Sequence, residues 1–129
     1  MKKLTILALL ILLAGSLVYA KKKNEGEGVA TLKEQIWDFG TIKKDKAVSH
    51  EFVFTNTGDG NLVILDAKAD CGCTRPEYPQ NPIAPGKTGK IKVTYNAIGR
   101  PGNFEKTVTL RTNGKPKTIR LKIRGNTLP

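Results

Sequence analysis

The chain has two cysteines, two positions apart, in the segment Asp70-Cys71-Gly72-Cys73-Thr74-Arg75-Pro76. Side chains at this spacing on a flat strand point the same way, but their Cβ atoms lie further apart than the roughly 3.8 Å that a disulfide requires. Gly72 can supply a bend that closes the gap. A bridge across so small a ring removes little entropy from the unfolded chain, so it would stabilise the fold only weakly.

Several chemical uses of Cys71 and Cys73 follow, beside a structural role in which the two sulfurs cap a loop, reduced or bridged. A strained ring is easily reduced, which suits thiol–disulfide exchange. Two thiolates from one bend could instead hold Cu(I) or Zn(II), although His50 is the only histidine and Met1 the only methionine. A covalent or partner contact is a further use. The supporting loop consists of Asp70, Gly72, Thr74 and Arg75, in which Arg75 would favour a thiolate and Asp70 would oppose it.

The other candidate residues have simpler interpretations. His50 is expected at a surface or edge position, and a nucleophilic pair of His50 with Cys71 or Cys73 stays open. The large aromatic residues predicted for the core or its rim are Trp37, Phe39 and Phe104. The chain contains no G-x-S-x-G, H-E-x-x-H or phosphate-binding glycine loop. We therefore predict a protein that is not an enzyme and needs no cofactor, with its metal content unknown.

Short strands surround these residues. Turn signals fall at residues 56–60, 85–86, 99–102 and 113–114. Between them apolar residues alternate with polar ones, as Ile91, Val93 and Tyr95 do with the residues between them. Strands of this kind have one dry and one wet face, and pairing the dry faces builds a sandwich. We expect an all-β, immunoglobulin-like antiparallel β-sandwich of about seven strands over residues 29–126.

The first twenty residues have the three parts of a secretory signal peptide. Lys2 and Lys3 precede an apolar run from Leu4 to Val18, and a small-residue site ends at Ala20. The run is several residues shorter than a membrane-spanning helix needs to be, although Lys21 and its neighbours could act as a stop-transfer flank. We expect a signal-peptide helix at 1–20, a flexible lead-in at 21–28, and no stable membrane span after cleavage.

Export and charge together narrow the range of partners. Ser16 stands where a lipoprotein would carry its cysteine, so we expect a soluble periplasmic or secreted product. After cleavage 20 basic and 11 acidic residues remain, a net charge of +9. Export argues against nucleic acid as the partner. Lysines and arginines on exposed strands also discourage edge-to-edge aggregation. An envelope protein or an anionic envelope polymer is the expected partner.

Several segments resemble one family of exported bacterial proteins. The matching segments, in order, are Trp37-Asp38-Phe39-Gly40-Thr41-Ile42, Phe52-Val53-Phe54-Thr55-Asn56-Thr57-Gly58-Asp59, Asp70-Cys71-Gly72-Cys73-Thr74, Ile83-Ala84-Pro85-Gly86 and Gly89-Lys90-Ile91-Lys92-Val93. The family is a domain of unknown function with a Cys-Gly-Cys-Thr signature. The resemblance implies an immunoglobulin-like fold, similar to the major-sperm-protein and ASH/Hydin sandwiches.

The functional expectation is therefore an exported binding or scaffolding module without enzymatic activity. One alternative is a thiol-active protein that uses Cys71 and Cys73 for exchange or soft-metal capture. The other is adhesion to an anionic polymer through the basic surface, which should weaken as salt rises.

Overall fold

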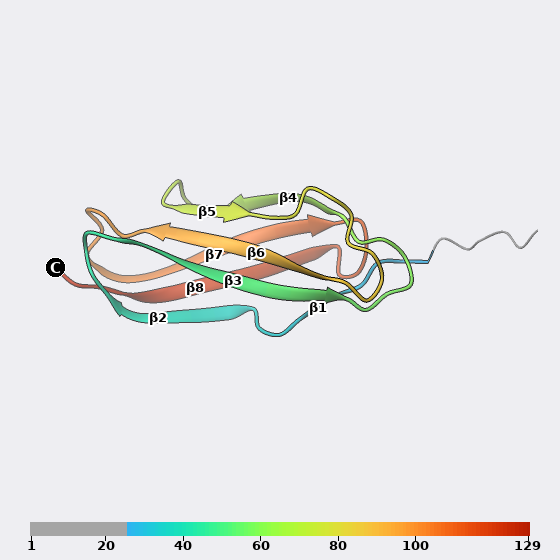
Figure 1. The fold of residues 1–129 in the computed structure, drawn as a ribbon. Coiled ribbons are helices and arrows are strands. Elements are labelled where there is room, and N and C mark those ends of the chain that lie inside the picture. Colours follow the sequence, from blue (N-terminus) through green and yellow to red (C-terminus); the bar gives the residue numbers. More distant parts are fainter. Residues whose placement is uncertain (1–25) are drawn as a thin grey trace, which may run out of the picture.

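The computed structural model describes residues 26–129 (Figure 1), so the predicted signal peptide and most of the predicted lead-in lie outside the described residues. Eight strands make up the described part, and no helix there is long and apolar enough to cross a membrane. The strands are β1 (Ala30–Leu32), β2 (Ile36–Ile42), β3 (Ala47–Asn56), β4 (Ile64–Ala69), β5 (Thr74–Glu77), β6 (Thr88–Asn96), β7 (Gly102–Thr112) and β8 (Thr118–Thr127).

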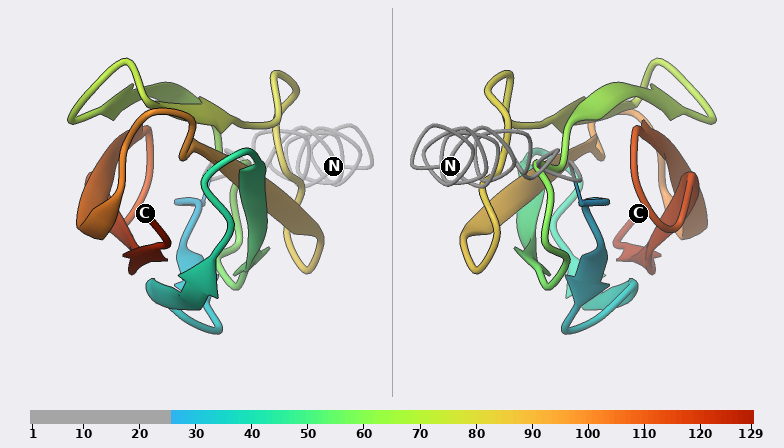
Figure 2. Two further views of the ribbon diagram at one scale, coloured as in Figure 1. Left: turned by 90° about the vertical axis from the view of Figure 1, so that its left-hand side faces the viewer. Right: turned by 90° about the vertical axis from the view of Figure 1, so that its right-hand side faces the viewer.

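The strands form two four-stranded sheets that pack face to face (Figures 1 and 2). One sheet has the order β1-β3-β6-β5 and the other the order β2-β8-β7-β4. This confirms the predicted immunoglobulin-like sandwich. The structure adds an eighth strand, because the chain leaves the first sheet after β1 and enters the second as β2. There β2 pairs with β8 in parallel, whereas every other neighbouring pair is antiparallel.

The core lies between the sheets and follows the alternation in the sequence. Ile91, Val93 and Tyr95 of β6 are buried in one core cluster that also contains inward side chains of β8, while the residues between them face outward or are half-buried. Each large apolar side chain buried in this way contributes about 1.5–3 kcal/mol to stability. Phe104 of β7 stacks on Tyr95 with ring centroids 3.9 Å apart, which ties the two sheets together.

Asn56 organises one end of the sandwich. The residue is fully buried, and its side-chain Oδ1 accepts hydrogen bonds from the backbone N–H groups of Val29 and Gly58 at 3.1 and 3.0 Å. Its Nδ2 donates to the carbonyl oxygens of Gly60 and Ile83, both at 2.8 Å. One amide thus joins the start of β1, the turn after β3 and the segment before β6.

The described end of the predicted lead-in, residues 26–28, is hydrogen-bonded to the domain. The Glu27 N–H donates to Asp59 Oδ1 at 3.0 Å, and the Lys115 N–H donates to the Gly28 carbonyl at 2.9 Å. Gly26 also lies close to Gly60, because a Cβ on Gly60 would come within 1.7 Å of the Gly26 carbonyl oxygen.

Candidate functional site

Cys71 and Cys73 are joined by a disulfide that closes the turn between β4 and β5. Their Cα atoms are 5.2 Å apart, and the Thr74 N–H donates to the Cys71 carbonyl at 3.2 Å, so the chain bends at Gly72 as the spacing requires. The turn lies toward the end of the sandwich that carries the C-terminus, as do the β2–β3 and β6–β7 connections (Figure 1).

The two cysteines differ in their exposure. Cys73 belongs to the buried core, Cys71 is half-buried, and a Cβ placed on Gly72 would have open space around it. An attacking thiolate would therefore reach the bridge from the Cys71 side. Reduction would leave one half-buried cysteine, Cys71, and one in the core, Cys73.

The remaining residues of the predicted supporting loop have separate positions. The Asp70 carboxylate accepts a hydrogen bond from the Thr107 N–H at 2.8 Å, which fastens the turn to β7. Thr74 is buried, with its hydroxyl 3.8 Å from the sulfur of Cys71. Arg75 is exposed on β5, opposite Thr94. Within residues 26–129 no group of three or more His, Cys, Asp or Glu side chains is arranged to hold a metal ion.

Removing the disulfide should have a small effect on stability. The ring between Cys71 and Cys73 is so short that chain entropy predicts a loss of less than about 2 kcal/mol. Comparing thermal unfolding of the wild type, with and without reductant, against the variant carrying both Cys71→Ser and Cys73→Ser measures this loss. A collapse of the fold in the variant and in the reduced wild type alike would contradict the prediction.

His50 lies in the seam where β2 of one sheet meets β3 of the other. Its ring stacks on Trp37 of β2, with centroids 4.0 Å apart and planes 6° apart, and meets the edge of Phe52. A ring nitrogen is bonded to the carboxylate of Glu34, not to either cysteine. The side chain is 16 % exposed and β3 lies inside its sheet, whereas the sequence suggested a surface or edge position. Only the strand switch from β1 to β2 brings Trp37 and Glu34 to this histidine.

His50→Ala should lower the free energy of unfolding by about 1–2 kcal/mol, because it removes both the ring stack on Trp37 and the partner of Glu34. His50→Phe keeps an aromatic ring and loses only the contact with Glu34. Its free energy of unfolding should therefore lie between those of the wild type and His50→Ala. Urea unfolding of the three proteins measures the order. Equal stability of His50→Ala and the wild type would show that the contacts of His50 with Trp37 and Glu34 do not stabilise the domain.

The edge of the second sheet exposes apolar side chains. β2 is an edge strand, and Ile36 and Trp37, next to each other at its start, are 51 % and 37 % exposed. The sequence predicted Trp37 at the core or its rim; the structure places it at the rim. The exposure of Ile36 had no sequence signal, because a strand's place at the edge of a sheet is set by its distant partner β8.

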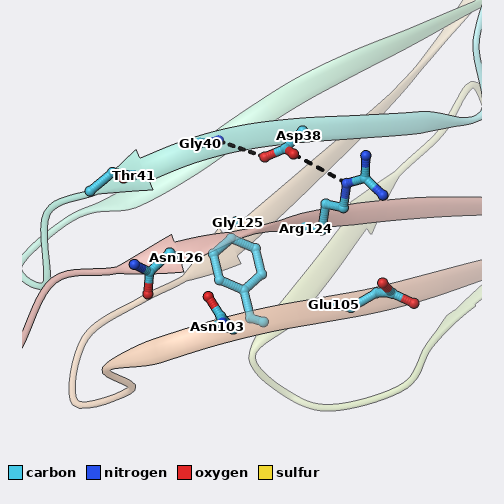
Figure 3. Close-up of a pocket in the computed structure, with 9 residues that line it drawn as sticks. Asp38, Gly40, Thr41, Asn103, Glu105, Arg124, Gly125 and Asn126 are labelled. Carbon is cyan, nitrogen blue, oxygen red and sulfur yellow. Dashed lines mark hydrogen bonds and ion pairs between the residues drawn. The ribbon is translucent and has the colours of Figure 1, made fainter.

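A depression of about 530 Å³ lies on the outer face of β2, β8 and β7 (Figure 3). Polar residues of all three strands surround it, and Gly40 and Gly125 lie between them. Gly40 has a φ of 67° and forms a bulge in β2, where the Asp38 carboxylate accepts a hydrogen bond from the Gly40 N–H at 2.8 Å. The sequence did not indicate this site, because its residues come from three separate segments.

Ion pairs neutralise much of the charge on this outer face. Arg124 binds Asp38 at 3.2 Å, Lys122 binds Glu105 at 3.1 Å, and the Arg111 guanidinium binds Asp66. Pairs as exposed as these contribute at most about 1 kcal/mol each. Three basic side chains of this outer face are therefore paired with carboxylates.

The contact with Arg111 lowers the pKa of the Asp66 carboxyl. The hydrogen bond from Arg111 holds the pKa of Asp66 below its ordinary value of 3.8, while burial acts in the opposite direction. The pair's contribution to stability is therefore present above the pKa of the unfolded carboxyl, and it is lost as the pH falls through the lower folded pKa. Arg111→Gln should raise the pKa of Asp66 toward 3.8, which carboxyl-carbon NMR titration can follow. An unchanged titration in the variant would contradict this.

Comparison with solved structures supports the fold. A protein of unknown function from Porphyromonas gingivalis W83 is similar, with a TM-score of 0.68, 13 % identity, and coverage of 84 % of this chain and 51 % of that one. The ASH/PapD-like domain 7 of human CEP192 has a TM-score of 0.61 and 12 % identity, covering 87 % of this chain and 93 % of that one. The Vibrio cholerae VesB protease has a TM-score of 0.59 and 13 % identity, covering 78 % and 32 %.

At 12–13 % identity, these similarities show a shared fold and nothing further. The chain spans about half of the Porphyromonas protein and about a third of the protease. A search of curated protein sequences finds no match. The profile of a family described as "Protein of unknown function (DUF1573)" matches residues 30–127, which is nearly all of the described sandwich.

Proposed function

This chain belongs to the DUF1573 family of proteins of unknown function, and we propose that it serves as an exported, non-enzymatic binding module that engages a protein partner at the edge strand β2. The observation that carries this proposal is the exposed apolar pair Ile36 and Trp37 on that edge. An exposed strand edge offers unpaired N–H and C=O groups to an added strand, and neighbouring side chains give the addition its specificity.

The other three edges of the sandwich are less suited to strand addition. β1 and β5 are short, with three and four residues, and β5 contains Pro76, which cannot donate a backbone hydrogen bond. β4 has six residues, one fewer than β2, and each of these two strands has one irregularity in its register. β2 is longer, with seven residues, and Trp37 is of the residue type that most often anchors a protein interface.

The test is a pull-down from envelope extract with matched variants of two exposed apolar residues. Ile36→Glu places a charge on the β2 edge, and Leu65→Glu places one on β4, where Leu65 is 49 % exposed. We expect the wild type and Leu65→Glu to recover the same partner, and Ile36→Glu to lose it. Recovery of that partner by all three proteins, or its loss from both variants, would refute docking at β2.

A second candidate function is thiol–disulfide exchange, favoured by the accessible Cys71 side of the bridge. Replacing both cysteines by serine in the same pull-down tests it, because an exchange partner held as a mixed disulfide would disappear. A reduction potential below about −300 mV would mark the bridge as structural and exclude exchange.

A third candidate is adhesion to an anionic envelope polymer. The turn between β2 and β3 exposes Lys43, Lys44 and Lys46, none of which forms an ion pair within residues 26–129. Binding to lipopolysaccharide should then fall steeply as salt rises above physiological strength. Replacing the three lysines by glutamine should abolish it, and unchanged binding would exclude this surface.

A further inference from the structure

The depression in Figure 3 is framed by two rows of side chains that cross β2, β8 and β7. One row, called here the charged row, consists of Asp38, Arg124 and Glu105. The other, called the neutral row, consists of Thr41, Asn126 and Asn103. Strand spacing sets the frame at about 10 Å across the three strands and about 7 Å between the rows. These dimensions suit one small ring-shaped molecule.

Two glycines and an aromatic ring determine the shape of the frame. The bulge at Gly40 separates Asp38 from Thr41 along β2, and so sets the two rows apart on that strand. Behind β8, a Cβ on Gly125 would lie 2.8 Å from both the Gly40 carbonyl oxygen and Cζ of Phe104. Phe104 also belongs to the lining, although it is only 8 % exposed. The Phe104 ring therefore packs behind the backbone at the centre of the depression.

The polar groups of the frame have capacity left for a ligand. Among residues 26–129, the side-chain amides of Asn103 and Asn126 and the hydroxyl of Thr41 have no hydrogen-bond partner. The Nε of Arg124 donates to Asp38 at 3.2 Å, while its terminal nitrogens have no partner in that part of the chain. Amides both donate and accept, and guanidinium nitrogens only donate. A ligand that satisfies them all must itself carry groups able to donate and to accept.

The charges around the frame favour an uncharged ligand. Asp38 is paired with Arg124, and Glu105 is paired with Lys122 at 3.1 Å beside the depression. The formal charges of these two pairs cancel. An anion would meet the carboxylates of Asp38 and Glu105, whereas a cation would compete with Arg124 for Asp38. The local balance contrasts with the net charge of +11 on the whole chain.

We infer that this depression binds a neutral polyhydroxylated ring, the chemistry of a single sugar unit of a glycan. Each sugar hydroxyl both donates and accepts, so different hydroxyls of one ring can pair with the amides of the neutral row and with the Arg124 guanidinium. The volume falls within the range of small-molecule sites. The site lies on the face of the sheet, whereas the proposed protein contact uses the backbone edge of β2, so neither depends on the other.

The test is NMR titration of the purified, ¹⁵N-labelled protein with neutral methyl glycosides. The probes are methyl glucoside, methyl galactoside and methyl N-acetylglucosaminide, with inorganic phosphate and glucuronate as charged comparators. We expect at least one neutral glycoside to give saturable shifts at the amides of Gly40, Gly125 and Asn126, with an affinity of about 1 mM, as weak single-ring contacts give. Phosphate and glucuronate should not produce this pattern.

Matched variants make the result specific to the frame. Asn126→Ala and Asn103→Ala each remove an exposed amide, so they should fold normally and bind at least about tenfold more weakly. Thr88→Ala, an exposed change on β6 of the other sheet, should bind as the wild type does. No saturable shift with any glycoside, equal binding by the Asn126→Ala variant, or preference for the charged comparators would each overturn the inference. Failure here would leave the pull-down result for Ile36→Glu unaffected.

Discussion

Asn56→Ala should destabilise the domain by at least about 3 kcal/mol, because it leaves several buried backbone groups without partners. The side chain of Asn56 is the partner of two N–H groups, on Val29 and Gly58, and of two carbonyl groups, on Gly60 and Ile83. Alanine keeps the strand geometry but supplies no hydrogen bond in a position that is fully buried. Urea unfolding measures the loss, and the melting temperature should fall by more than 10 °C on the scale of about 4–8 °C per kcal/mol for a domain of this size.

Two further variants separate this explanation from a general sensitivity of the turn at residues 56–60 to substitution. Asn56→Asp keeps the shape but replaces the donating NH2 group by an acceptor, so it should also destabilise strongly. Thr57→Ala, next along the chain, removes only an exposed hydroxyl bonded to Thr31 and should cost little. If Asn56→Ala loses no more stability than Thr57→Ala, the buried amide does not organise this end of the sandwich.

The role of Asn56 shows how far local sequence signals reach. The sequence predicts a turn at residues 56–60, and the structure has β3 end at Asn56 with a turn following it. The alternation in β6 and β8 likewise predicts which side chains enter the core. Both are properties of residues close together in the chain. The partners of the Asn56 side chain are as far away as Ile83, so no local pattern could identify them.

Pairing between distant strands accounts for what the sequence could not predict. Sequence alternation cannot tell whether β1 and β2 form one strand or two, because the switch between sheets depends on β3 and β8. The seam around His50 and the exposed edge at Ile36 both follow from that switch. The candidate sites differ in the same way. The residues of the cysteine turn are contiguous in the chain, so the sequence alone indicates them. The charged and neutral rows on either side of Gly125 form only when β2, β8 and β7 pair in register.

Phe104→Ala should be among the most damaging single changes, with a loss of about 3–5 kcal/mol, the usual cost of truncating a buried phenylalanine. The ring stacks on Tyr95 and lies 6.4 Å from Phe39, so it contacts residues from both sheets. Phe104→Leu keeps most of the apolar volume and should lose less. Unfolding in urea ranks the three proteins, and a loss below about 1 kcal/mol for Phe104→Ala would mean that the sheets repack without the ring.

A double-mutant cycle tests the contact between Phe104 and the backbone of β8. Gly125→Ala should destabilise the wild type by about 1–3 kcal/mol, because its Cβ would approach the Phe104 ring and the Gly40 carbonyl oxygen at 2.8 Å each. In the Phe104→Leu background part of that clash is relieved, so Gly125→Ala should cost measurably less there. Coupling of at least about 0.5 kcal/mol is expected for residues in contact. Additive losses would show that the new methyl group clashes only with the Gly40 carbonyl oxygen. The Phe104 ring would then not pack against the backbone behind the depression.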